Sequence, residues 1–244
     1  MTTKREREYA RRRHEKWLAH QEVVRARERR RRVVAAWALG ALVLVGAVAL
    51  AVSLLSDSSS DTTADTSSAA PDPALAEGRT WTSVLTTSVG DITLELDGAA
   101  APQAVANFIS LADAHYFDSA DCHRLTTLDE DGIAVLQCGD PTGTGTGTPG
   151  YTWGPIENAP TDDVYPAGTV AMARTGDDGS SMGSQFFIVY EDSTIPADSA
   201  GGYTVFGRVT DGLDLVQQVG EAGIDEENKP SPVIPVTIEK VETK

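Results

Sequence analysis

The stretches CHR (residues 122–124), QCGD (residues 137–140) and GSQFFI (residues 183–188) decide the fold and the function of this chain when they are taken together. Each lies in or beside a short segment that has the apolar content of a β-strand. Together they supply one permanent cation, Arg124, one amide, Gln137, and two adjacent aromatic rings. This set of groups suits the binding of a peptide bond without its cleavage, because it offers hydrogen-bond donors and apolar surface.

The segments around these stretches predict a domain made mainly of strands. Polar and apolar residues alternate over 91–96, as in a strand with one buried face. The other predicted strands are 81–87, 133–138, 170–173, 185–190, 204–209 and 233–241. Two helices are expected, one that Pro102 opens and a shorter one at 213–219. Many short strands with only two helices favour an antiparallel β-barrel.

Charge divides the chain into two parts. Residues 1–32 contain 13 Lys and Arg against 5 Asp and Glu, whereas the remainder contains 7 against 31, so the net charges are +8 and −24. This asymmetry indicates two environments. The acidic part would repel the phosphates of nucleic acid, so we expect no nucleic-acid partner for it. The basic segment reads as a solvated helix or tail that orients the chain or contacts anionic headgroups, with a nucleic-acid-binding arm as the alternative.

The run VVAAWALGALVLVGAVALAVSLL at 33–55 has 23 residues and no charge. About 20 apolar residues span the hydrocarbon core of a bilayer as a helix. Arginines at 29–32 precede the run, so the positive-inside rule places residues 1–32 in the cytoplasm and the C-terminal domain outside. A cleaved signal peptide is the competing interpretation, but its apolar region would be about 7–15 residues long. We therefore expect a single-pass transmembrane helix in the cell membrane.

The segment 56–78 is rich in Ser, Thr, Asp, Ala and Pro, and this composition predicts a disordered linker. The chain is therefore expected to consist of four parts. These are a basic cytoplasmic segment at 1–32, the transmembrane helix at 33–55, the linker and a folded domain at 79–244.

Several short sequences resemble the motifs of other enzymes but lack residues that those motifs require. No Gly-Lys-Ser/Thr follows the glycine-rich residues 143–147, so a phosphate loop is unsupported. Residues 183–185 lack the second glycine of a nucleophile elbow. His115 and His123 are the only histidines beyond the apolar run, and no zinc or calcium spacing occurs around them. We expect neither a metal nor a cofactor.

Arg124 is one of seven basic residues beyond residue 32. Its guanidinium presents five donors and stays charged, so it suits hydrogen bonding to a peptide and not proton transfer. A surface ion pair is the ordinary alternative for an isolated arginine. Gln137 would contact a substrate backbone or satisfy an amide at the barrel rim. Phe186 and Phe187 would lie on opposite faces of one strand.

Cys122 and Cys138 are the only cysteines, and both lie outside the cytoplasm in the expected topology, where disulfides persist. They flank a predicted hairpin, so opposed positions are plausible. Sequence alone does not fix the distance between their Cα atoms, and two buried thiols remain the alternative.

Residues 80–242 resemble the cyclophilin-type peptidyl-prolyl isomerases. Six segments carry the resemblance in order: 107–108, 123–124, 137–140, 168–173, 183–188 and 205–209. It implies an eight-stranded antiparallel β-barrel capped by two helices. It also implies isomerisation of X–Pro bonds.

The resemblance also implies the site residues. Arg124 matches the catalytic arginine, Gln137 a substrate-contacting glutamine and Phe187 the floor of the proline pocket. The other substrate contacts that it implies are Ala134, Val135, Ala173, Arg174, Gln185, Ile195 and Tyr203.

The chain departs from the family at several of these positions. Ala134 stands where a pocket phenylalanine is usual, Arg174 where asparagine is common, and Thr194 where a tryptophan accompanies cyclosporin sensitivity. The loop 126–132 is longer and acidic. The alanine would make the pocket shallower or more open, so we expect lower or narrower activity and weak cyclosporin binding.

The expected function is isomerisation of X–Pro bonds in exported proteins, with Arg124 donating a hydrogen bond to the prolyl nitrogen. The alternative is a catalytically weak scaffold or chaperone of the cell envelope that binds proline peptides, which the alanine at 134 keeps open. The expected partners are proline-containing peptides or unfolded exported proteins, and the membrane through residues 33–55. The folded domain is expected to be a monomer.

Overall fold

The computed structural model describes residues 69–228 and 230–244 of the 244-residue chain. The expected basic segment at 1–32, the membrane helix at 33–55 and linker residues 56–68 lie outside the described residues. Among the residues that are described, no helix combines the length and the apolar character needed to cross a membrane.

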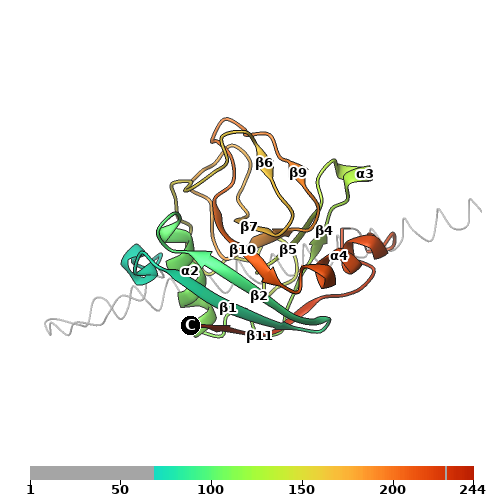
Figure 1. Cartoon of the computed structure of the whole chain (residues 1–244), viewed down its shortest axis with the longest axis horizontal. Coiled ribbons are helices and arrows are strands. Elements are labelled where there is room, and N and C mark those ends of the chain that lie inside the picture. Colours follow the sequence, from blue (N-terminus) through green and yellow to red (C-terminus); the bar gives the residue numbers. More distant parts are fainter. Residues whose placement is uncertain (1–68, 229) are drawn as a thin grey trace, which may run out of the picture. The chain divides into compact units, whose positions relative to one another are not determined.

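Short strands dominate the described domain (Figure 1). They are β1 (Thr80–Thr87), β2 (Gly90–Asp97), β3 (Ala120–Asp121), β4 (Arg124–Leu125), β5 (Val135–Cys138), β6 (Val164–Tyr165), β7 (Thr169–Met172), β8 (Phe186–Val189), β9 (Ser193–Thr194), β10 (Val205–Asp211) and β11 (Thr237–Thr243). The helical elements are the 3₁₀ turn η1 (Pro73–Ala76), α2 (Pro102–Asp113), the single turn α3 (Leu128–Asp131) and α4 (Leu213–Ala222).

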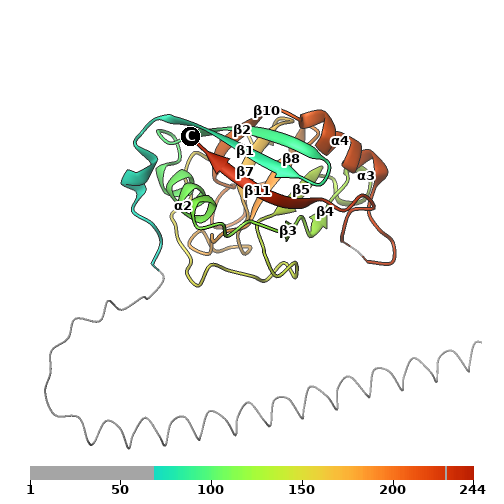
Figure 2. The same cartoon turned by 90° about the horizontal axis from the view of Figure 1, so that it is seen from below.

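Nine of these strands form one antiparallel sheet in the order β3-β11-β1-β2-β10-β7-β8-β5-β4, and β6 pairs with β9 separately. The eight-stranded barrel is therefore corrected to a curled nine-stranded sheet (Figure 2). The prediction missed β3 and β4 because a strand of two residues is too short to show a period of two. Since only two residues separate these edge strands in the chain, the edges of the sheet lie close together.

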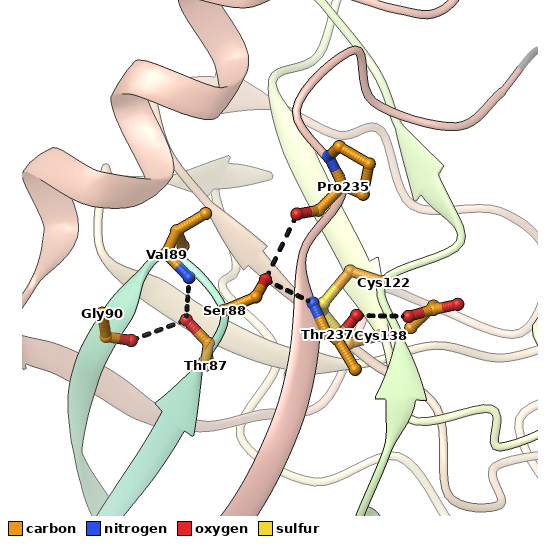
Figure 3. The surroundings of a disulfide bond; sticks show 9 residues. Thr87, Ser88, Val89, Gly90, Cys122, Cys138, Pro235 and Thr237 are labelled. Carbon is orange, nitrogen blue, oxygen red and sulfur yellow. Dashed lines mark hydrogen bonds between the residues drawn. A yellow bond between two sulfur atoms is a disulfide. The ribbon is translucent and has the colours of Figure 1, made fainter.

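The disulfide lies at this seam between the two edges of the sheet. It joins Cys122, which follows β3, to Cys138 at the end of β5, with 4.0 Å between the two Cα atoms. Figure 3 places it beside the start of β11, where the Thr237 hydroxyl donates to Asp121 at 2.6 Å. The disulfide thus connects the two ends of the sheet, β3 and the β4–β5 pair, which are not joined by backbone pairing.

The core lies between the concave sheet and α2. On β2 the side chains of Ile92, Leu94 and Leu96 point inward and are almost fully buried, as the alternation predicts. Phe108 of α2 packs against the rings of Phe117, Phe186 and Phe206 at centroid distances of 5.2–5.6 Å. This cluster fixes α2 on the strand that carries Phe186.

The folded domain begins before residue 79, so the linker prediction is wrong for its last residues. Ala76 of η1 is fully buried, and its carbonyl accepts a hydrogen bond from the Trp81 indole at 2.8 Å. The Gln103 amide donates to the Pro71 carbonyl at 2.9 Å. The composition of this segment is that of a linker. Even so, the buried Ala76 side chain and the backbone carbonyls of Pro71 and Ala76 attach it to the folded domain.

The two predicted helices are present as α2 and α4, and the closing strand starts later than expected. Residues 233–236 precede β11 because Pro232 and Pro235 provide no backbone donor for strand pairing.

The acidic loop at 126–132 contains the single turn α3, which the Thr127 hydroxyl caps.

Candidate active site

Three adjacent strands place the predicted polar and aromatic residues side by side. Arg124 on β4 is opposite Gln137 on β5, and Gln137 is opposite Phe187 on β8. The Arg124 guanidinium donates to the Gln137 carbonyl oxygen at 3.2 Å. This is the one side-chain hydrogen bond of that guanidinium within the described part of the chain, so further N–H groups remain for a ligand.

Gln137 is held in one orientation by its second neighbour. Its amide nitrogen donates to the Gln185 carbonyl oxygen at 2.8 Å. The Gln185 amide in turn donates to the carbonyls of Gly145 and Gly147 at 3.1 and 3.0 Å. The chain of bonds ties Arg124 to the glycine-threonine loop through two amides.

An apolar cavity of about 120 Å³ opens beside Arg124 and Gln137. Phe187 is 5% exposed and packs edge-on against Tyr203, with 5.5 Å between ring centroids. The cavity is lined by Arg124, Ile133, Val135, Gln137, Ala173, Arg174, Phe187, Ile195 and Tyr203. Most of the residues expected at the substrate site therefore share one cavity, with the cation and the amide at its polar side.

Ala134 does not line this cavity, contrary to the prediction. It is fully buried in the main core, and its backbone N–H donates to the Ser193 hydroxyl at 2.9 Å. Because adjacent residues of an extended segment point to opposite sides, Ile133 and Val135 face the cavity instead. Ile133 is the site residue that the prediction missed, and its place two residues before Val135 in an apolar run was the available signal.

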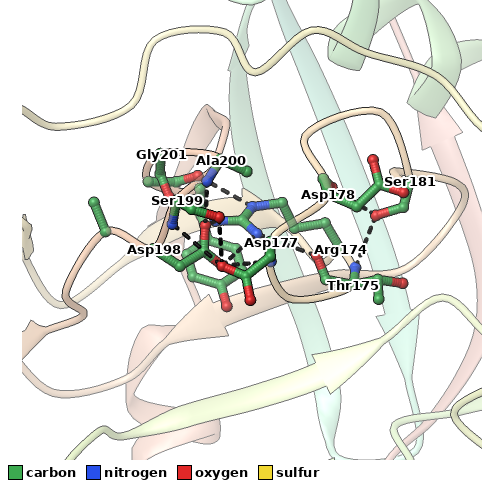
Figure 4. Close-up of polar contacts among 12 residues, drawn as sticks. Arg174, Thr175, Asp177, Asp178, Ser181, Asp198, Ser199, Ala200 and Gly201 are labelled. Carbon is green, nitrogen blue, oxygen red and sulfur yellow. Dashed lines mark hydrogen bonds and ion pairs between the residues drawn. The ribbon is translucent and has the colours of Figure 1, made fainter.

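Arg174 is also unlike the predicted substrate contact. Its side chain is fully buried and forms an ion pair with Asp198 at 2.8 Å. Its remaining donors go to the carbonyls of Thr175, Gly201 and Gly202 (Figure 4). Five N–H groups thus serve five protein acceptors, which leaves none for a substrate. Arg174 forms part of the cavity wall only.

A second, larger hollow of about 400 Å³ adjoins the first and shares Gln137, Ala173 and Arg174 with it. Gln185 lines this hollow and not the apolar cavity. Its other walls are glycines and hydroxyl residues: Gly145, Thr146, Gly147, Thr148, Thr152, Thr175, Ser181, Gly183 and Ser184. An extended peptide could place one residue in the apolar cavity and its neighbours along this polar hollow.

The glycine-threonine loop is folded around Asp140. Burial raises the pKa of this carboxyl, but hydrogen bonds from Thr142 and from the Gly147 backbone outweigh that effect and bring the pKa to about 2. A charged Asp140 therefore anchors the loop that holds Gln185.

His123 lies behind the site. Burial lowers its pKa, while contacts with the Asp121 backbone and the Gln185 side chain oppose that shift. Neither ring nitrogen reaches hydrogen-bond geometry with a described residue. His123 follows Cys122 in the seam and is absent from the lining of both cavities. A neutral, buried imidazole at this place is not positioned to act as a base.

Comparison with known proteins shows the family of this domain. A family model described as cyclophilin type peptidyl-prolyl cis-trans isomerase matches residues 82–243. The probable peptidyl-prolyl cis-trans isomerase B of Mycobacterium tuberculosis is 40% identical over 169 residues, which cover 63% of this chain and 52% of that protein. The peptidyl-prolyl cis-trans isomerase B of Bacillus subtilis is 40% identical over 137 residues, 56% of this chain and 87% of that protein. The chain thus spans about half the length of the mycobacterial relative.

Solved structures show the same fold. A cyclophilin type peptidyl-prolyl cis-trans isomerase from Cryptosporidium parvum aligns with a TM-score of 0.57 and 27% identity, over 68% of this chain and 98% of that one. A second structure of that protein, solved in the presence of the dipeptide Ala-Pro, aligns with a TM-score of 0.55 and 28% identity, over 66% of this chain and 96% of that one. The chain belongs to the cyclophilin-type peptidyl-prolyl cis-trans isomerase family.

Proposed function

We propose that this protein accelerates the cis–trans isomerisation of X–Pro bonds in exported proteins. The observation that carries the proposal is that a permanent cation, Arg124, and an oriented amide, Gln137, line the same cavity as the Phe187 ring. Family membership supports it, as does the Ala-Pro dipeptide used with a related structure.

The mechanism that we propose needs only binding and hydrogen bonding. Amide resonance gives rotation about a peptide bond a barrier of about 18–20 kcal/mol. The cavity holds the proline ring, and Gln137 contacts the preceding carbonyl. Arg124 donates to the prolyl nitrogen as that atom becomes pyramidal and loses its conjugation. A donor that is aimed at the transition state lowers the barrier preferentially.

The alternative, a catalytically weak scaffold, depends on an alanine in the wall of the proline pocket. Ala134 lies in the core and Ile133 lines the cavity, and this placement favours the isomerase over the scaffold. Exchange NMR of an X–Pro peptide with the full-length chain tests the proposal. Cross-peaks between cis and trans signals at catalytic amounts of protein are expected, whereas peptide binding without exchange would support the scaffold.

We further propose that residues 33–55 anchor the protein in the cell membrane, with residues 1–32 in the cytoplasm and the domain outside. The apolar run and its flanking charges support this topology. The disulfide is consistent with an oxidising compartment. Protease added to intact cells should digest the domain and spare an epitope placed before residue 32. Protection of the domain would contradict the topology.

A further inference from the structure

An ion pair between the buried Arg174 side chain and the half-buried Asp198 side chain crosslinks the two loops beside the proline cavity. The Asp198 carboxylate accepts from both terminal nitrogens of Arg174, at 2.8 and 2.9 Å. It also accepts from the backbone N–H groups of Asp177 and Ala200, both at 2.9 Å. Each oxygen of the carboxylate thus accepts two hydrogen bonds. The Asp198 carboxylate thereby links the loop after Arg174, through Asp177, to its own loop, through Ala200.

The loop 195–203 wraps around the guanidinium. Asp198 and Gly201 exchange backbone hydrogen bonds across the turn of this loop, at 3.2 and 3.0 Å. Within the turn the carbonyls of Gly201 and Gly202 accept from Arg174, as Figure 4 shows for Gly201. The Arg174 bonds hold the pKa of Asp198 well below its usual range, so the pair stays charged at any neutral pH.

Both ends of this loop reach the cavity. Ile195 and Tyr203 line it, and the Tyr203 ring lies over the Arg174 guanidinium, 4.6 Å from its carbon to the ring centroid. The Tyr203 ring also packs at a steep angle against Phe187, with 5.5 Å between the ring centroids. The Tyr203 backbone N–H donates to the Tyr165 hydroxyl at 2.8 Å, which fixes the height of the ring.

We propose that Arg174 and Asp198 are positioning residues of the proline cavity, which act through Tyr203 and Ile195 and set the affinity for the prolyl ring without taking part in the bond rotation. This inference rests on the proposed function for the identity of the occupant. It assigns the two arginines of the site to separate tasks, because Arg124 keeps donors for the substrate and Arg174 has none.

The test compares isomerase kinetics of the full-length chain with those of Arg174→Lys, Asp198→Asn and the apolar double variant Arg174→Met/Asp198→Leu. The last leaves no unpaired buried charge, and such replacements often preserve folding. Loss of apolar contact in the cavity should raise KM about tenfold while kcat stays within about twofold. The matched control is Glu95→Gln, which breaks the exposed Arg208–Glu95 pair and should change neither constant.

A double-mutant cycle with Tyr203→Ala separates positioning from general loss of structure. If the pair acts through this ring, the KM effects of Tyr203→Ala and of the apolar double variant will not add. Additive effects, or an unchanged KM in the folded variants beside an active parent chain, would overturn the inference. An inactive parent chain would instead count against the proposed function.

Discussion

Burial and hydrogen bonding give the site residues roles that residue type alone does not. Arg124 and Arg174 are both arginines that line the same cavity, yet the Arg124 guanidinium donates to one acceptor atom and the Arg174 guanidinium to five. Resemblance correctly brought Arg124, Gln137 and Phe187 to one place, because their strands are neighbours. It misplaced Ala134 and Arg174, whose roles depend on which way a side chain turns and on a loop that comes later in the chain.

The core position of Ala134 can be tested with the larger residue usual in the family. Ala134→Phe should not deepen the proline cavity. It should overpack the main core and lower the free energy of unfolding by about 1–3 kcal/mol, as urea denaturation would measure. Higher affinity for a proline peptide without loss of stability would show that residue 134 faces the cavity.

Ile133 should behave as a wall of the cavity. Ile133→Ala removes apolar contact from the bound ring and should weaken binding of an Ala-Pro peptide by about 1 kcal/mol or more. Titration followed by NMR measures the change. Val233→Ala, at an exposed residue, serves as the control. Equal affinities for Ile133→Ala and the parent chain would remove Ile133 from the site.

Asp140 should give the domain an acid-sensitive stability. Its pKa is about 2 in the folded protein and near 3.8 without these contacts, so the stabilisation is complete above about pH 4. It is lost as the pH falls through about 2, and amounts to about 2 kcal/mol. Urea unfolding from pH 5 to 2 should show this slope, and Asp140→Asn should flatten it. An equal dependence of the unfolding free energy on pH in Asp140→Asn and in the parent chain would contradict the lowered pKa of Asp140.

At the scale of elements, strands with a clear period were predictable and very short ones were not. The alternation over 91–96 predicts β2, and the apolar run at 133–138 predicts β5. The strand β4 holds only two residues, and its existence depends on pairing with β5, which no local pattern encodes. Since β4 carries Arg124, the residue that we propose as catalytic lies on the strand that the sequence predicts least well.

The disulfide should therefore matter for activity as well as for stability. Cys122 lies two residues before Arg124, just ahead of β4, and Cys138 directly follows Gln137 on β5, the strand that pairs with β4. Replacing both cysteines by alanine should lower the free energy of unfolding by about 3 kcal/mol and reduce kcat/KM. Urea unfolding and isomerase assays with and without reductant measure both effects. Equal unfolding free energies of the reduced and oxidised protein would contradict a stabilising role of the Cys122–Cys138 disulfide.

At the scale of the whole molecule, the pattern of short strands predicted a mainly β domain, but the linker-like composition of 56–78 misplaced its start. Linker-like residues before 79 belong to the fold because Ala76 and Pro71 meet the core and α2. The number of strands likewise follows from long-range pairing, in which the C-terminal strand β11 lies between β3 and β1. Such pairing between distant segments is not visible in any local stretch of the sequence.

The start of the domain can be tested by truncation. A chain that begins at residue 69 should be more stable than one that begins at 79, by about 1–3 kcal/mol. The shorter chain leaves the half-buried Trp81 indole without its acceptor and uncovers the core beneath Ala76. Thermal unfolding of the two chains makes the comparison. Equal midpoints of thermal unfolding would support the boundary at residue 79 that the sequence predicts.

We expect Arg124, which lines the apolar cavity, to catalyse rotation about the X–Pro bond. The most direct measurement is kcat/KM for one X–Pro peptide in a protease-coupled assay, for the full-length chain and for Arg124→Ala. Loss of a donor aimed at the transition state predicts a fall of about tenfold or more with an unchanged unfolding midpoint. Equal turnover by the two folded proteins would contradict the claim.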